Sequence, residues 1–344
     1  MIRAVSTSSP KRVAVALLAS GLVLAGCGTT AAVTTIAGTP SISIAVPLRT
    51  VACTATGICV AVGTSGADAG ITSAGEDRSA TGAWRSLEVP AAPSSQLTTS
   101  SCWNDGCLFG GAQPSGDLVW YYNALTRTTT SVRPPARGSD VSQLSCFAPS
   151  SCALVDATGV AAGARLSFTT DAGATWSPPV GVTSTAGTRV TGLSCTSASD
   201  CLAVLTTTHA TSSIESTSDA GRTWTTVVTP TSWTFVSSLS CHALNCSALV
   251  GASSGLRFAR SRDGGVTWRS FALDTQANAV ACTATGRCVL VGQNGPLHAW
   301  LATLVHKKLS TRALQYVPSP LDDVACGARV CAAIAVSTLV ALRP

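Results

Sequence analysis

The sequence predicts an all-β protein built from seven copies of one antiparallel unit. Short runs of β-branched and other apolar residues, separated by Gly, Pro, Asp and Ser, fill the chain after residue 40. No stretch in that region has the sustained 3.6-residue periodicity of an amphipathic helix. A pair of cysteines five or six positions apart also recurs seven times, which indicates an internal repeat.

The N-terminal residues form a targeting segment that precedes the fold. A basic stretch leads into twelve mainly apolar residues (13–24), too few for a membrane span, which needs about 20. The run ends in Leu24-Ala25-Gly26-Cys27, which resembles the lipobox of bacterial lipoproteins. That resemblance implies a signal peptide over 1–26, lipidation of Cys27, a tether over 27–40, and an extracytoplasmic protein held on the bacterial cell membrane. The alternative is an ordinary secretory signal that contains a cysteine.

Composition argues against a nucleic-acid partner. The formal charge of +6 falls to +3 once the signal segment is removed, and no Lys/Arg cluster follows it. The glycine-rich stretches precede no capped helix, so they are interpreted as loops rather than phosphate-binding turns. We expect a monomer without a cofactor or a metal ion.

The seven cysteine pairs predict local disulfides. Each pair fits a strand, a tight turn with a cysteine at each end, and a second strand, and facing positions of such a hairpin lie within disulfide range. Zinc sites are the weaker alternative, because they need further ligands and the four histidines (His209, His242, His298 and His306) show no ligand spacing. The pairs are Cys53/Cys59, Cys102/Cys107, Cys146/Cys152, Cys195/Cys201, Cys241/Cys246, Cys282/Cys288 and Cys326/Cys331.

A second motif follows the cysteine hairpin in three of the repeats. It reads TTDAGATW at 169–176, TSDAGRTW at 217–224 and SRDGGVTW at 261–268. The Asp is suited to accept hydrogen bonds from turn amides, the Gly allows special backbone conformations, and the Trp fills space between sheets. We expect structural roles for Asp171, Gly173, Trp176, Asp219, Gly221, Trp224, Asp263, Gly265 and Trp268.

This motif resembles the Asp box, or bacterial neuraminidase repeat, of β-propellers such as sialidases, sortilin-type receptors and the photosystem II stability-factor family. The resemblance implies that residues 41–344 form a seven-bladed propeller of four-stranded antiparallel blades, with the box between the third and fourth strands. The last repeat, from Asp322, supplies only three strands. We expect the segment SISIAVP at 41–47 to complete that blade and close the ring.

The residues favour a non-catalytic binding or assembly module for an envelope protein or glycan, and leave a carbohydrate-active enzyme as the alternative. A sialidase-like site needs an arginine cluster, a Tyr/Glu pair and an acid, but the chain lacks an Arg-Ile-Pro-like segment near the start of the propeller. Glu215 falls in a third strand beside a box and is peripheral. Asp322 and Asp323 are adjacent, so on a strand their side chains point to opposite faces and do not act together. A glycosidase that uses two other carboxylates remains an alternative.

We expect the binding site on the face opposite the cysteine and box turns. Both kinds of turn follow odd-numbered strands and so share one face, whereas the unrepeated loops lie on the other. Trp103 and Trp120 are interpreted as packing residues. The candidate ligand-binding residues are Arg49, Arg137, Asp140, Gln143, His209, Trp233, Asp274, Asn278, Tyr316, Asp322 and Asp323.

Overall fold

The structure is a computed structural model of the whole chain. The chain divides into two compact units, Met1–Ala32 and Val33–Pro344, and every residue described here belongs to the second. The described ranges are 47–65, 71–77, 84–90, 92–135, 140–157, 163–182, 187–293, 299–305, 308–313, 320–328, 330–335 and 338–342. The predicted signal peptide, Cys27, the tether and residues 41–46 lie outside them.

Within these ranges the chain forms only antiparallel strands, and it contains no helix long and apolar enough to cross a membrane. The first two repeats supply β1 (Leu48–Cys53), β2 (Cys59–Ser65), β3 (Ile71–Asp77), β4 (Trp84–Pro90), β5 (Gln96–Cys102), β6 (Gly106–Gln113), β7 (Gly116–Asn123) and β8 (Thr128–Val132). The next two supply β9 (Asp140–Ala148), β10 (Ser151–Ala157), β11 (Ala164–Thr169), β12 (Val180–Gly181), β13 (Arg189–Cys195), β14 (Cys201–Thr206), β15 (Ser212–Thr217) and β16 (Thr225–Thr226).

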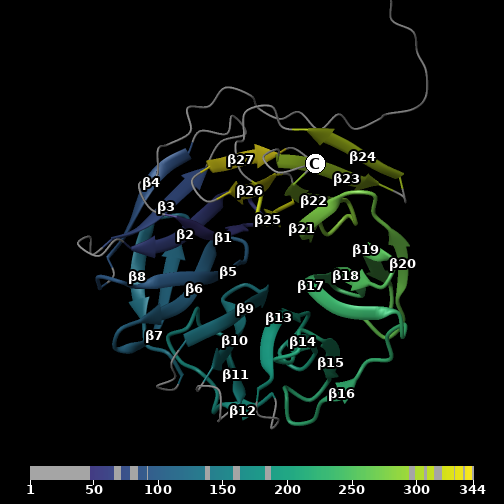
Figure 1. Cartoon of the computed structure of the whole chain (residues 1–344). Helices are drawn as coiled ribbons and strands as arrows, with labels where there is room; N and C mark the ends of the chain where they lie inside the picture. Colours follow the sequence, from purple (N-terminus) through teal and green to yellow (C-terminus); the bar gives the residue numbers. More distant parts are fainter. Residues whose placement is uncertain are drawn as a thin grey trace, which may run out of the picture. The chain divides into compact units, whose positions relative to one another are not determined.

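The remaining three repeats complete the set. They supply β17 (Trp233–His242), β18 (Asn245–Ala252), β19 (Gly255–Ser261), β20 (Arg269–Ala272), β21 (Gln276–Cys282), β22 (Cys288–Gln293), β23 (Ala299–Val305), β24 (Lys308–Ala313), β25 (Asp323–Cys326), β26 (Cys331–Ala335) and β27 (Thr338–Leu342). Within each repeat consecutive strands pair, and the first strand of the repeat lies toward the centre in Figure 1. The fold is an all-β propeller with four-stranded antiparallel blades.

Hydrogen bonding groups the described strands into six sheets, not seven separate ones. Four sheets have four strands each, and β25, β26 and β27 form a sheet of three. The strands β1 to β8 belong to a single eight-stranded sheet because one bridge, between Thr64 and Gln96, joins β2 to β5. The first two sequence repeats are therefore linked through their backbones.

The seven predicted disulfides are confirmed. In every pair the two cysteines face one another across the first hairpin of a repeat, with Cα atoms 3.9 to 4.0 Å apart. The hairpin itself creates this proximity, because the two cysteines of each pair are only five or six positions apart. Disulfides in this number indicate an extracytoplasmic protein, since reducing compartments do not preserve them.

The expectation that a cysteine lies at each end of the turn is wrong for three of the seven pairs. Cys107, Cys152 and Cys246 each lie one residue inside their strand, because β6, β10 and β18 begin one residue before the cysteine. In the fifth repeat, for example, His242 still pairs with Asn245 beyond the disulfide. In the third and fifth repeats the first two strands therefore stay paired beyond the disulfide, so the connecting turn is tighter than the cysteine spacing alone indicates. In the second repeat the pairing of β5 with β6 ends at Cys102 and Cys107.

The three box segments form nearly identical turns beside these disulfides. Asp219 Oδ1 accepts from the Thr223 N–H at 2.9 Å and Asp219 Oδ2 from the Thr223 hydroxyl at 2.6 Å, while Thr217 Oγ1 accepts from the Gly221 N–H at 2.9 Å. Gly221 has a φ of +82°, which favours glycine. Thr217 pairs with Cys201 in the sheet, so the box and cysteine turns lie at the same end, as predicted.

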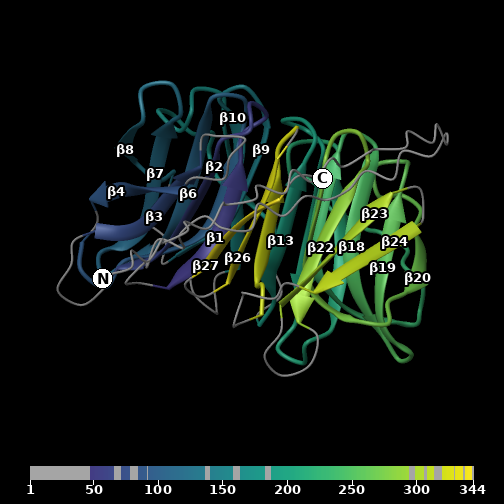
Figure 2. The same ribbon diagram turned by 90° about the horizontal axis from the view of Figure 1, so that it is seen from above.

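The core consists of seven apolar clusters, each between strands of two consecutive repeats. The box tryptophans belong to these clusters, and Trp268 packs with Leu202 and Val204 of the preceding repeat. One cluster joins β1 and β2 to β25 and β26, which brings the last repeat against the first. Figures 1 and 2 both show β1 beside β26.

Candidate functional site

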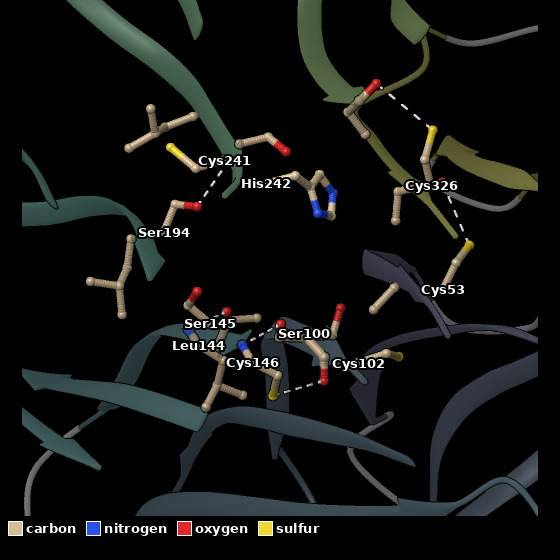
Figure 3. Close-up of a pocket in the computed structure, with 18 of the residues that line it drawn as sticks. Cys53, Ser100, Cys102, Leu144, Ser145, Cys146, Ser194, Cys241, His242 and Cys326 are labelled. Carbon is tan, nitrogen blue, oxygen red and sulfur yellow. Dashed lines mark hydrogen bonds between the residues drawn. The ribbon is translucent and has the colours of Figure 1, made fainter. Parts of the chain in front are cut away.

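The candidate site is a cavity of about 710 Å³ enclosed by the first strand of every repeat. Figure 3 shows the side chains that converge on it. Each repeat contributes a short segment that ends at or just after its first cysteine. These segments come from β1, β5, β9, β13, β17, β21 and β25, together with the residues that follow each strand.

The two cysteines of each pair differ in their relation to this cavity. The first cysteine of every pair lines the cavity, whereas the second lies on the next strand outward and does not line it. Each second cysteine is instead buried in an apolar cluster between repeats, because it lies on the second strand, one strand further from the centre. This group comprises Cys59, Cys107, Cys152, Cys201, Cys246, Cys288 and Cys331. These cysteines therefore contribute to the scaffold and not to the binding surface.

Serine hydroxyls from one repeat cover the exposed backbone edge of the next. The residue before the first cysteine is serine in the second to fifth repeats, and three of these serines accept a hydrogen bond from the cysteine N–H of the following repeat. Ser101 Oγ accepts from Cys146 N at 2.8 Å, Ser145 Oγ from Cys195 N at 2.8 Å, and Ser194 Oγ from Cys241 N at 2.9 Å. These bonds satisfy edge donors that would otherwise stay unpaired.

A second row of such bonds lies two residues earlier on the first strands. Thr99 Oγ1 accepts from Leu144 N at 3.1 Å, and Ser238 Oγ accepts from Val280 N at 3.3 Å. Between the last repeat and the first, the acceptor is a carboxylate, because Asp323 Oδ2 accepts from Val51 N at 3.0 Å. Hydroxyl groups therefore accept hydrogen bonds from backbone N–H groups between repeats around the cavity. Between the last repeat and the first, an acidic side chain takes this role.

Asp323 is held by hydrogen bonds on both carboxylate oxygens. Oδ2 also accepts from the Thr50 hydroxyl at 3.1 Å, and Oδ1 accepts from the Val324 N–H at 2.9 Å. Burial raises the pKa of Asp323 to about 6; these hydrogen bonds oppose the shift, and the charge of Asp322 adds to it. Thr50 Oγ1 lies 2.8 Å from Ser100 Oγ, so a chain of hydroxyls continues into the second repeat.

The starts of the first strands bring Arg49 and Asp322 to one end of the cavity. Burial raises the pKa of Asp322, and the positive charge of Arg49 lowers it. Together with Asp323, these are the residues with formal charge among the described lining. The cavity is thus polar but carries little net charge.

His242 lines the cavity at the other end, although the sequence analysis found no ligand spacing around it and assigned it no binding role. It follows Cys241 directly, and its ring points into the open space in Figure 3. Burial lowers the pKa of His242, and a hydrogen bond between its ring and the backbone of Cys282 acts in the opposite direction. His242 directly follows the first cysteine of its repeat, as Thr196 and Phe147 do in theirs, and all three line the cavity. An alignment of the repeats on their cysteines places the three residues at the same position.

The cavity brings together four of the predicted ligand-binding residues: Arg49, Gln143, Asp322 and Asp323. Asn278 does not line it, but its side-chain amide donates to the Leu321 carbonyl at 2.9 Å, next to Asp322.

The other predicted residues lie elsewhere. Trp233 packs edge-to-face on Trp268, with ring centroids 6.0 Å apart, and belongs to the apolar contact between the fourth and fifth repeats. Asp140 begins β9, while His209 and Asp274 are exposed in connections between strands, and none of the three lines the cavity. Arg137 and Tyr316 lie outside the described residues.

The described cavity lining contains two carboxylates, which are adjacent in the sequence. Asp322 and Asp323 are the acids of the described lining, and the carboxylate of Asp323 is directed at the β1 backbone. Glu215 is buried and accepts from the Thr226 hydroxyl at 3.0 Å, so it is peripheral as expected. No cluster of three metal-binding side chains occurs among the residues that the structure describes. Trp120 is packed in the core, as predicted, whereas Trp103 is packed in a core cluster and also lines the cavity.

No protein-family model and no curated protein matches the chain. Solved structures resemble it in fold. YCF48 bound to D1 peptide has a TM-score of 0.61 at 12% identity, covering 91% of this chain and 96% of that one. Virginiamycin B lyase from Staphylococcus aureus, with quinupristin, has a TM-score of 0.62 at 11% identity, covering 88% and 97%. A xyloglucanase from Xanthomonas campestris gives 0.59 at 13% identity, covering 87% of this chain and 52% of that one. At these identities the likeness shows the fold alone, a β-propeller.

Proposed function

We propose that this protein is an extracytoplasmic binding module that holds a segment of an envelope protein or glycan in its central cavity, without catalysis. The observation that carries the proposal is the cavity itself. It is polar, it is built from every cysteine repeat, and a rigid scaffold of disulfides and interlocked strands surrounds it. A preformed site of this kind binds without the entropic cost of ordering its own wall.

We further propose that the domain is a seven-bladed propeller. Seven cysteine hairpins, seven inner strands around the cavity and seven apolar clusters between consecutive repeats support that number. The single Thr64–Gln96 bridge between the first two repeats is compatible with two neighbouring blades. The three-stranded last sheet leaves β27 with a free edge among the described strands, which residues 41–46 would cover as a fourth strand.

A protein segment is the favoured ligand. The backbone N–H and C=O groups of a bound segment can form hydrogen bonds with the hydroxyl and carbonyl groups that line the cavity. The similar structure of YCF48 is in complex with a peptide. A glycan presents the same hydroxyl chemistry and is the second candidate. The lipobox-like segment supports anchoring through Cys27 to the cell membrane, which would keep the domain close to envelope partners.

The alternative, a glycoside hydrolase, has less support. Hydrolysis uses two carboxyl groups on either side of the scissile bond, and the described lining offers two adjacent acids, one of them bonded to β1. Purified protein should therefore show no turnover of chromogenic glycosides or sialosides. Turnover that disappears in Asp322→Asn would instead establish an enzyme.

Capture from native envelope extract with the oxidised, full chain tests the binding proposal. The cavity variant carries Arg49→Ala with Asp322→Asn, and the control carries His209→Ala with Asp274→Ala, two exposed residues away from the cavity. We expect one partner to be retained by the wild type and the control but lost by the cavity variant, at an unchanged melting temperature. Retention by the cavity variant, or equal loss in the control, would contradict the assignment.

A further inference from the structure

Three polar residues form a row across the sheet of the fifth repeat. Ser247 on β18 pairs with Arg260 on β19, and Arg260 pairs with Arg269 on β20. Residues paired in this way share one face of the sheet, with Cβ atoms about 5 Å apart. The row therefore places two arginine side chains next to one another on one face of the sheet, and the repulsion between their positive charges is relieved when an anion binds near them.

Neither arginine has an acceptor among the described residues. Arg260 and Arg269 make no hydrogen bond or ion pair with any of them, and Arg260 Nε is shielded from solvent without a partner there. Comparable arginines on middle strands are satisfied. Arg165 donates to both oxygens of Asp156 at 3.1 and 3.2 Å, and Arg257 donates to the hydroxyl and carbonyl of Ser270 at 3.0 and 3.2 Å.

The nearest acidic residue along the chain does not neutralise the pair. Asp263, in the box turn after β19, accepts from the Ser261 hydroxyl at 2.6 Å and from the Thr267 N–H at 2.9 Å. Its carboxylate is thus committed to its own turn, and hydrogen bonds rather than any arginine account for its lowered pKa.

The row faces the disulfide turn of the sixth repeat. Ser247 Oγ lies 3.1 Å from Cys282 Sγ, and Gly286 of that turn lies over the Arg260 guanidinium. A Cβ at Gly286 would come within 2.8 Å of an Arg260 nitrogen, which shows how closely the guanidinium approaches this turn.

The corresponding rows in the neighbouring repeats are uncharged. In the fourth repeat the row is Leu202, Ser216 and Thr225. In the sixth it is Val289, Thr303 and Ser310. The repeat therefore does not need arginines at these positions, because the neighbouring repeats form the same sheet with neutral residues.

We propose that Arg260 and Arg269 form a binding site for an oxyanion group, namely the carboxylate, phosphate or sulfate of a ligand. Two oxygens of such a group, placed between the two guanidinium ions, would accept hydrogen bonds from both, including one from the shielded Nε of Arg260. The site lies on β19 and β20, the third and fourth strands of the fifth repeat, which do not line the central cavity. It does not depend on what that cavity binds.

Titration of the full, oxidised chain with sodium phosphate, sulfate or acetate tests this site, with sodium chloride matched for ionic strength. The readout is the Nε–H signals of the arginine side chains in ¹H–¹⁵N NMR spectra. We expect a saturable shift of the Arg260 signal with at least one oxyanion and none with chloride. The oxyanion with the highest affinity identifies the ligand's acidic group.

The matched variants are Arg269→Gln and Arg222→Gln, both at exposed positions, so both should fold as the wild type does. Arg269→Gln should weaken oxyanion binding about tenfold, which corresponds to about 1.4 kcal/mol, while Arg222→Gln leaves it unchanged. Absence of a saturable shift with all three anions would overturn the proposal. An equal loss of affinity in the two variants would also overturn it, because the effect would then be one of net charge.

Discussion

Asp323 Oδ2 accepts a hydrogen bond at 3.0 Å from the backbone N–H of Val51, which lies 272 residues earlier in the chain. This bond joins the last repeat to the first. At the equivalent contacts between the second and third repeats and between the fifth and sixth, the acceptor is the hydroxyl of Thr99 or Ser238. The acceptor between the last repeat and the first is thus an ionisable carboxylate, whereas neutral hydroxyl groups accept at the other two contacts.

This substitution makes the junction sensitive to pH. Because burial raises the pKa of Asp323 to about 6, above the value near 3.9 of an unfolded chain, the folded state binds the proton more tightly. The free energy of unfolding should therefore be highest below about pH 4 for this group and fall as pH rises through about 6, by about 1–3 kcal/mol. Denaturant unfolding between pH 4 and 8 measures the change.

Asp323→Asn should remove most of this pH dependence. Asp322→Asn, at the exposed neighbour, should retain most of it, because the charge of Asp322 is the smallest contribution to the raised pKa of Asp323. If the asparagine variant does not fold, ¹³C NMR titration of the wild-type carboxyl group provides the same information. A midpoint near 4 would contradict the raised pKa.

The serine hydroxyls between repeats should contribute measurably to stability. Ser194→Ala leaves the Cys241 N–H without its acceptor, and an unsatisfied donor of this kind costs about 1–2 kcal/mol. Ser240→Ala is the matched control, because Ser240 also precedes a first cysteine but its hydroxyl makes no hydrogen bond in the described structure. Equal destabilisation of both variants in chemical denaturation would rule out this role for Ser194.

Each disulfide should stabilise its own hairpin independently. Replacing Cys195 and Cys201 together by alanine removes a link that closes a six-residue separation, for which the chain-entropy model gives about 2 kcal/mol. The double variants at two hairpins should be additive, since the links are local and well separated in the fold. Peptide mapping under non-reducing conditions should recover only the seven pairs within hairpins.

The box aspartates should stabilise the fold on the acidic side of the pH range. Hydrogen bonds from Thr223 and Thr217 lower the pKa of Asp219 to about 2, below its unfolded value. The stability that Asp219 contributes is therefore present above about pH 4 and lost as pH falls toward 2. Asp219→Ala should lower the melting temperature at pH 7 and weaken this acid-side loss, whereas Asp274→Ala, at an exposed position, should change neither.

The proposed closing strand can be tested by truncation. Deleting residues 41–46 should markedly lower the melting temperature of the mature chain, because the edge of β27 would lose its partner. Pro47 is retained, since its carbonyl accepts from the Thr64 N–H at 3.1 Å. Deleting residues 28–40 instead should leave the transition unchanged. An unchanged transition after removal of 41–46 would argue against closure by this segment.

The features that the sequence determined are local. A cysteine five or six residues from its partner can only face it across a tight hairpin, and Asp171, Asp219 and Asp263 each bond to residues within four positions. Such contacts follow from strand periodicity and turn chemistry alone. For the same reason the shared end of the cysteine and box turns could be deduced from the order of the strands.

Strand ends were less predictable than the disulfides themselves. Cys107, Cys152 and Cys246 form the expected links, yet each lies one residue inside its strand instead of at the strand's start. The spacing of two cysteines fixes which residues face one another, but it does not fix how far the paired strands continue beyond them. That extent depends on hydrogen bonds made within the turn.

The composition of the cavity was decided by tertiary structure. Arg49, Asp322 and Asp323 were correctly placed near one another because strand starts are predictable, but the aromatic residue expected beside them, Trp233, packs against Trp268 instead. His242 lines the cavity, although its local sequence indicates only a turn. The bond between Asp323 and Val51 depends on how many repeats the chain traverses before its ends meet, and on the accumulated twist of every sheet between them. Contacts of that range are set by the packing of the whole domain, which no short stretch of sequence specifies.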